Sequence, residues 1–530
     1  MTSRIIAAAC ACACACLLAA ASTATAAELA PVRQQQLAVA IGVPTEGRTL
    51  DPARASYQST INVQNAFLAP LYVAGPNGLA PLLAVGQPVV SGGGRIITVH
   101  LRAATWSDGK PVSSTDVVTA FARARKLHNY FSSFTEGVAS IATPTPRTVV
   151  FKLRKADPVF RQLLALQVFT PVPTHVIARA HERWTRAGTM VSSGPFVLKS
   201  SNSTQLVGQR NPRYWRARGV RLQTLTFTTT GDVGRTSTEA RYIGRFVGAA
   251  LPHTMLITQL PAAVLANSKI VRSASTEAQY MYLNTTNASL ADPRVRRGIA
   301  LALDRSSLRP SADDVALSTV LPSRVNGGSV VTSGAHLLEA SGSADTAAAS
   351  AQLAAGGWSN GTSLVLAYSK DSGLAGAMAS KIRSQLATVG VTVVLKPLTG
   401  DTMSSPGFGI SPVSPKIDML LQGWVLDYSE PYDYYQLFTC ANVQTGLNDS
   451  NFCDHGFDGA LASLATQFDW PARLAAYRRL ENRLTGPEGA MPLVPLYSPV
   501  NEALARSWVR GYAVDANGQI FWDTLAVEKH

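Results

Sequence analysis

Cysteine is scarce in this 530-residue chain once the opening segment is set aside. Four of the six cysteines lie within the first 16 residues, which leaves only Cys440 and Cys453. A scaffold built on many disulfides is therefore excluded, and a structural zinc site would need four ligands in recognisable pairs. In an exported protein the pair favours a disulfide. A metal site that includes Asp454 and His455 is less favoured, and free thiols remain a third possibility.

Long apolar runs and enzyme motifs are also missing. No segment after residue 30 reaches the ~20 apolar residues of a membrane-spanning helix, so a soluble protein is expected. The chain has no phosphate-binding loop, no dinucleotide-binding glycine motif and no zinc-protease motif. Because a catalytic triad is defined by geometry and not by spacing, an exported hydrolase stays an alternative. A protein that is not an enzyme is expected.

A long uninterrupted run of basic residues is lacking as well, although the net charge is +14 at pH 7. The 47 lysines and arginines are spread along the whole chain. Nucleic acid is therefore not an expected partner. Net charge of this size bears on solubility and non-specific attraction, and says nothing about the fold.

The opening segment has the pattern of a secretory signal peptide. Arg4 precedes an uncharged apolar run over residues 5–21, and small residues follow at 24–26. This pattern predicts a signal peptide over residues 1–26 and a periplasmic or extracellular protein. A membrane anchor is the first alternative, but the run is shorter than the ~20 residues of a span. A lipid anchor is less favoured because the cysteines in the run lack a matching lipobox.

The rest of the chain alternates between helical and strand patterns. A chain of this length exceeds a single hydrophobic core, so two or three domains are expected. Helices are predicted at 62–72 and from Asp116 to about 126, where Ser113 and Asp116 form a capping-box pattern. Residues 362–398 have the clearest strand–helix–strand pattern, and 457–484 reads as helix with a break at Pro471. These patterns predict an α/β or α+β protein with several lobes.

Short motifs occur in a fixed order along the chain. The most specific is Trp106–Val112 followed by Asp116, which predicts a tight turn pinned by a buried tryptophan. The others are Leu50–Pro52, Gly78–Ala84, Gly194–Phe196 with Asn211–Trp215, Leu283–Asn284 with Asp292–Arg296 and Leu303–Arg305, Gly423–Trp424 with Asp427, Tyr428 and Pro431, and Met491–Tyr497. In this order and at this spacing they resemble extracellular solute-binding protein family 5, the oligopeptide- and dipeptide-binding proteins of ABC importers.

The resemblance implies a two-lobed periplasmic-binding-protein fold of type II, cluster C. In this fold the ligand binds between two α/β lobes that close on it, and lobe I carries an extra subdomain. By similarity, lobe I takes residues 30–72, 187–275 and 493–530, the extra subdomain 73–186, and lobe II 276–492. Residues 230–270 depart from the family pattern, because no Gly-Glu-x-Asp segment is recognisable there.

The function implied is capture of di- or oligopeptides and their delivery to an ABC importer permease in the membrane. A monomer without a cofactor or metal is expected. Within the family the ligand could instead be a nickel chelate, haem, a sugar or an antibiotic-like peptide. A ligand sensor or a chaperone with the same fold is a further alternative.

Asp427 is the implied contact for the α-ammonium group of a peptide, since an acid in a closing cleft needs a cationic partner. A turn or helix-capping role before Pro431 is its alternative. Trp424 would form a pocket wall or belong to the core, and for Tyr428 packing is favoured over ligand contact. The other implied ligand contacts are Ser56, Tyr57, Tyr280 and Tyr282.

Overall fold

The computed structural model describes residues 28–42, 49–55, 58–75, 78–127, 130–230, 248–250, 262–359, 361–403 and 417–530. The expected signal peptide lies outside these ranges, and so do Ser56, Tyr57 and much of the segment 230–270. No helix in the described part of the chain is long and apolar enough to cross a membrane.

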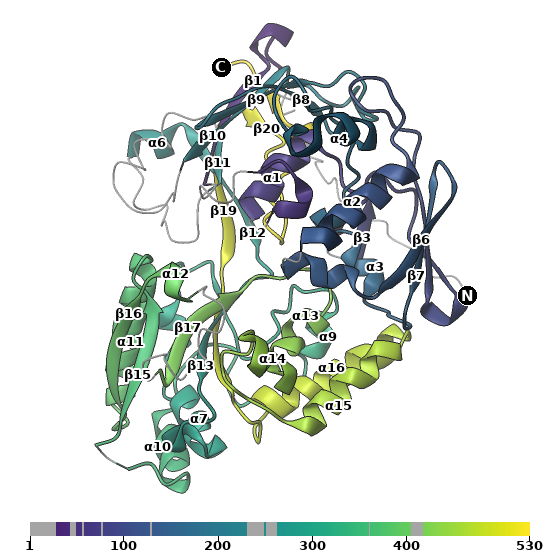
Figure 1. The fold of residues 1–530 in the computed structure, drawn as a ribbon. Coiled ribbons are helices and arrows are strands. Elements are labelled where there is room, and N and C mark those ends of the chain that lie inside the picture. Colours follow the sequence, from purple (N-terminus) through teal and green to yellow (C-terminus); the bar gives the residue numbers. More distant parts are fainter. Residues whose placement is uncertain are drawn as a thin grey trace, which may run out of the picture.

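A seven-stranded mixed sheet forms the upper lobe in Figure 1, in the order β12-β19-β11-β1-β10-β9-β8. Its central strand β1 runs parallel to β10 on one side and to β11 on the other. The sheet therefore joins the N-terminal, middle and C-terminal parts of the chain. Its strands are β1 (Gln36–Gly42), β8 (Phe196–Ser201), β9 (Gln205–Arg210), β10 (Thr224–Thr230), β11 (Gly248–Ala250), β12 (Ser268–Ala274) and β19 (Val500–Arg506).

A six-stranded sheet forms the lower lobe, in the order β14-β18-β13-β17-β15-β16. The predicted strand–helix–strand unit is confirmed, because β15 and β16 pair in parallel and α11 (Gly373–Ala387) connects them. The strands are β13 (Ala278–Leu283), β14 (Val315–Ala316), β15 (Ser363–Ser369), β16 (Thr392–Leu398), β17 (Met419–Trp424) and β18 (Leu493–Ser498).

The structure differs from the expected lobe boundary at residue 493. Strand β18 pairs with β13 and β14, so it belongs to the six-stranded sheet of lobe II. The chain returns to the lobe I sheet only at β19, which pairs with β12. Sequence similarity could not place this crossing, because β18 and β19 are separated by a single residue, Pro499.

The expected extra subdomain contains a four-stranded antiparallel sheet, which packs beside α2 (Ser114–Leu127). Helix α2 begins at Ser114, two residues before the predicted Asp116, and the expected pairing of Ser113 with Asp116 is confirmed. The Asp116 carboxylate accepts the backbone N–H of Ser113 at 2.9 Å and the indole N–H of the fully buried Trp106 at 3.1 Å. This most specific motif is therefore structural. The sheet comprises β4 (Val89–Ser91), β5 (Ile96–His100), β6 (Val138–Thr145) and β7 (Thr148–Leu153), with a separate hairpin β2 (Tyr72–Gly75) and β3 (Gly78–Pro81).

Two helices cover one side of lobe II, α15 (His455–Ser463) and α16 (Trp470–Thr485). The predicted break at Pro471 is wrong in position, because the helices are separated at residues 464–469. Asp469 caps α16 by accepting the backbone N–H of Ala472 at 2.9 Å, and Pro471 lies in the first turn. Proline is tolerated there since the first N–H groups of a helix have no partner within it.

Cys440 and Cys453 are joined by a disulfide in the structure, with an S–S distance of 2.06 Å. It closes the loop from α14 (Cys440–Thr445) to α15, and His455 lies beside it with Nδ1 3.8 Å from the Cys440 sulfur. We expect alkylation of the denatured, unreduced protein to label neither cysteine, and alkylation after reduction to label both. Mass spectrometry of the peptides checks this, and labelling before reduction would favour free thiols.

A half-buried acid in the same loop predicts a pH dependence of stability. Desolvation raises the pKa of Asp449 to about 7. Between the ordinary value of ~4 and this value the folded state keeps a proton that the unfolded state releases, so stability falls as pH rises through this window. Asp449→Asn is therefore expected to raise the melting temperature more at pH 8 than at pH 5. An equal shift at both pH values in thermal unfolding would contradict this.

Candidate functional site

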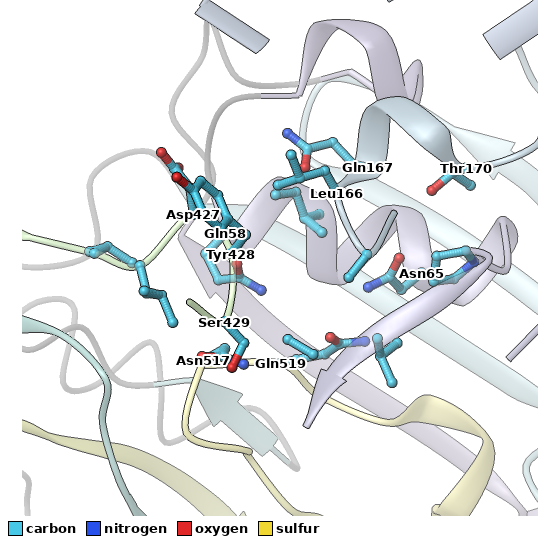
Figure 2. Close-up of a pocket in the computed structure, with 17 residues that line it drawn as sticks. Gln58, Asn65, Leu166, Gln167, Thr170, Asp427, Tyr428, Ser429, Asn517 and Gln519 are labelled. Carbon is cyan, nitrogen blue, oxygen red and sulfur yellow. The ribbon is translucent and has the colours of Figure 1, made fainter. Parts of the chain in front are cut away.

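A cavity of about 310 Å³ lies where the two lobes and the extra subdomain meet, and is called the interlobe cavity below. Helix α1 (Gln58–Phe67), strand β2, residues 165–170, the loop 425–429 and residues 517–519 contribute to its wall. Figure 2 shows Asp427 and Tyr428 at one end and Asn65 with Thr170 toward the other. The cavity thus joins segments that are far apart in the sequence.

Most polar groups of the wall are uncharged. Among the described residues that line the interlobe cavity, Asp427 is the one acidic residue, and none of them is basic. The neutral polar members are Gln58, Asn65, Gln167, Thr170, Ser429, Asn517 and Gln519, and the remainder is largely apolar. A wall with one carboxylate, several amides and apolar surface suits a ligand with a cationic group, hydrogen-bonding groups and apolar parts.

The wall is fixed by hydrogen bonds behind it. Asn62 of α1 is buried, and its side chain donates to the backbone oxygen of Gly518 at 2.8 Å and accepts from the N–H of Ile520 at 3.2 Å. These bonds tie α1 to the C-terminal segment that carries Asn517 and Gln519. On the other side, the Gln167 side chain donates to the backbone oxygen of Ala55 at 3.0 Å. The polar wall is therefore held by the fold before any ligand binds.

Asp427 lies in the loop that follows β17. Its backbone N–H donates to the carboxylate of Asp433 at 3.0 Å, and the indole N–H of Trp424 donates to the same oxygen at 3.0 Å. Trp424 is partly buried and packs against the lobe II core, and it is not among the residues that line the cavity. Of the two roles expected for Trp424, pocket wall or core, its packing fits the core, and its indole adds a contact behind the loop.

Tyr428 lines the cavity and also packs into a hydrophobic core. It is 4% exposed and belongs to the core that spans lobe I and the extra subdomain, although its own segment continues from a lobe II strand. Its ring lies edge-on to Phe134 with centroids 5.8 Å apart. The loop 425–429 thus anchors lobe II to the extra subdomain at the edge of the cavity.

The structure places Tyr280 and Tyr282 away from the interlobe cavity. Both are buried in the lobe II core, their ring centroids lie 5.7 Å apart, and the Tyr280 hydroxyl donates to the backbone oxygen of Val320. The ligand contact expected for Tyr280 and Tyr282 is therefore corrected. Both side chains point to the same face of β13, because side chains alternate along a strand, and helices pack against that face. Ser56 and Tyr57 lie outside the described residues.

The amide residues of the wall were not identified from the sequence. They come from helix α1, a short turn at 167 and the C-terminal loop, and none of them belongs to one of the recognised motifs. No local pattern distinguishes an amide in a cavity wall from one on the surface. The recognised motif nearest to these amides is Leu50–Pro52, which lies shortly before α1. It indicates only that this part of the chain follows the motif order of the family.

Comparison with known proteins identifies relatives along nearly the whole chain. The family described as "Bacterial extracellular solute-binding proteins, family 5 Middle" matches residues 78–445. The chain is 25% identical to the periplasmic oligopeptide-binding protein OppA of Salmonella typhimurium (92% of each chain). It is 26% identical to the periplasmic murein peptide-binding protein MppA of Escherichia coli (92% of this chain, 93% of that one). The solved ABC transporter substrate-binding protein CtaP of Listeria monocytogenes superposes with a TM-score of 0.80 at 19% identity, covering 93% of this chain and 99% of CtaP.

Proposed function

The chain belongs to the bacterial extracellular solute-binding proteins of family 5, and from this we propose that it captures peptides in the interlobe cavity and delivers them to an ABC importer permease. The observation that carries the proposal is the position of Asp427 as the one acidic residue in the described wall. A peptide presents an α-ammonium group, then uncharged amides and finally a carboxylate, and this wall offers an acid for the first and neutral hydrogen-bonding groups for the second.

The Asp427 carboxylate is expected to contribute more to the binding free energy than the neutral groups of the wall do. An ionised acid in a cleft from which the ligand excludes water loses hydration, and a cationic partner restores the favourable interaction. An anionic ligand would find no compensating cation among the described lining residues and would be repelled by Asp427. The proposal therefore favours ligands with a free amino terminus over anions of similar size.

The amide side chains suit the backbone of the ligand. Asparagine and glutamine each carry donors and an acceptor, so they can bind peptide groups irrespective of the side chains of the ligand. The apolar part of the wall can accept small or apolar ligand side chains. Such a site reads the backbone, which fits a carrier for peptides of varied sequence. The names of the relatives OppA and MppA point the same way.

The signal peptide expected over residues 1–26 places this activity in the periplasm or outside the cell. There a soluble carrier would hold the peptide until it meets the permease subunits in the membrane. Lobe closure around the peptide would present one ligand-bound form to the permease, because a ligand shifts a two-state equilibrium toward the form that it binds better.

Native mass spectrometry of the purified protein, followed by release and sequencing of bound material, tests the proposal. We expect a set of short peptides with free amino termini. A single non-peptide mass would overturn the peptide assignment and favour a nickel chelate, haem or sugar. It would also remove the argument that Asp427 binds an ammonium group.

A further inference from the structure

Asp433 lies directly behind the loop that carries Asp427. It belongs to the short helix α13 (Tyr432–Tyr435), is 0% exposed, and is not among the residues that line the interlobe cavity. Its carboxylate accepts hydrogen bonds from three donors, and each bond is 3.0 Å long. The donors are the indole N–H of Trp424, the backbone N–H of Asp427 and the side-chain amide of Gln436.

The three donors come from three places in the fold. Trp424 is the last residue of β17, Asp427 lies in the cavity loop, and Gln436 follows α13. One buried carboxylate therefore joins the end of a strand, the ligand-facing loop and the next helical segment. Because the Asp427 bond is made by its backbone N–H, it fixes the peptide plane of Asp427 at the cavity wall.

A buried acid at this point is costly. Burial, and after it the neighbouring Asp427 carboxylate, raises the pKa of Asp433 well above its usual range. The three donated hydrogen bonds offset part of that cost. An apolar residue would suffice if this position only needed to fill the core, because replacing a buried polar network by packed apolar groups is often neutral or stabilising. The network is therefore better explained by what it does to the cavity loop.

We propose that Asp433 is a positioning residue that holds Asp427 where it meets the ammonium group of the ligand. The inference rests on the proposed function. Trp424 takes part in the same network, since its indole N–H shares the Asp433 oxygen that binds the Asp427 backbone. Trp424 would thus act on the ligand indirectly, through the loop that carries Asp427.

Asp433→Leu keeps a buried side chain of similar size but removes both acceptor oxygens. The backbone N–H of Asp427 and the indole N–H of Trp424 then lose the oxygen that they share. Loss of one hydrogen bond of ordinary strength corresponds to about a tenfold change in affinity. We expect the effect on binding to come from misplacement of Asp427, and hence to require an intact Asp427 carboxylate.

A double-mutant cycle tests this dependence. Isothermal titration calorimetry would measure the affinity for trialanine and tetraalanine of the unaltered protein, Asp433→Leu, Asp427→Asn and the double variant. We expect Asp433→Leu to weaken binding about tenfold in the unaltered background, and to have little further effect beside Asp427→Asn, since residues that act as a unit are not additive. Equal weakening in both backgrounds would overturn the inference and leave the proposed function standing.

Two further measurements separate positioning from folding. Trp424→Phe removes the indole donor while it keeps an aromatic ring, and it is expected to weaken binding in the same Asp427-dependent way even if Asp433→Leu folds poorly. Additive behaviour of Trp424→Phe would overturn the inference. Absence of alanine-peptide binding by the unaltered protein would overturn the peptide proposal, and this inference with it.

Discussion

Asp427→Asn is expected to weaken peptide binding at least tenfold without lowering the melting temperature of the ligand-free protein. The variant removes the one acidic group that the described cavity wall offers and leaves the α-ammonium group of the ligand without a partner. Truncating one partner of a buried charge pair typically costs ~2–5 kcal/mol of affinity. Asparagine keeps the shape of the side chain, and the backbone N–H that binds Asp433 is unaltered. Calorimetry with the peptides found on the purified protein measures the change.

Asp371→Asn provides a matched control for the change in net charge. Asp371 is exposed in the turn before α11 and does not line the cavity. Its replacement is expected to leave the affinity unchanged. N-terminal acetylation of the peptide is expected to weaken binding to the unaltered protein by a similar factor as Asp427→Asn does, because it removes the other partner of the same pair. Unchanged affinity in Asp427→Asn would refute the ligand role of this residue.

Arg473→Met is expected to lower the free energy of unfolding by about 3–5 kcal/mol. Arg473 of α16 and Glu430 of the cavity loop region form an ion pair in which each side chain is 2% exposed. The guanidinium also donates to the Tyr477 hydroxyl at 2.7 Å and to the backbone oxygen of Gln467 at 3.1 Å. Methionine leaves Glu430 buried without its cation. Burial already raises the pKa of Glu430, and the variant is expected to raise it further.

Chemical denaturation at neutral pH measures this loss. Arg479→Met is the matched control, because Arg479 is exposed on the same helix and its replacement is expected to change stability little. Adding Glu430→Gln to Arg473→Met is expected to recover part of the stability, since the unpaired charge is then removed. If Arg473→Met lowers the free energy of unfolding as little as Arg479→Met does, water reaches the Arg473–Glu430 ion pair in solution.

The sequence was informative where neighbouring residues decide the structure. The capping pattern of Ser113 and Asp116 predicts the start of α2, and the alternation over 362–398 predicts the parallel unit β15–α11–β16. Both depend on hydrogen bonds and apolar faces within short segments. The Pro471 prediction failed because proline disrupts the interior of a helix but not its first turn, and the sequence alone did not show where α16 begins.

The candidate site was less predictable. Asp427 and Tyr428 were selected through a motif, and the structure places both on the interlobe cavity. Trp424, in the same motif, lies behind the loop, and Tyr280 and Tyr282 lie in the lobe II core. Alternation along a strand predicts that Tyr280 and Tyr282 share a face. It does not predict whether that face meets the cavity or a layer of helices.

The residues and their order along the chain predict the family, the α/β class, the order of most local elements and the acid proposed to bind the ligand. Each of these depends on residue types at short spacing or on a series of motifs in order. The folded structure was needed to show that β18 belongs to lobe II, that amides from α1 and residues 517–519 line the same cavity as Asp427, and that Asp433 binds the Asp427 backbone. The reason is that these contacts join residues far apart along the chain or buried behind one loop, and such contacts form only when the two sheets and the extra subdomain pack together.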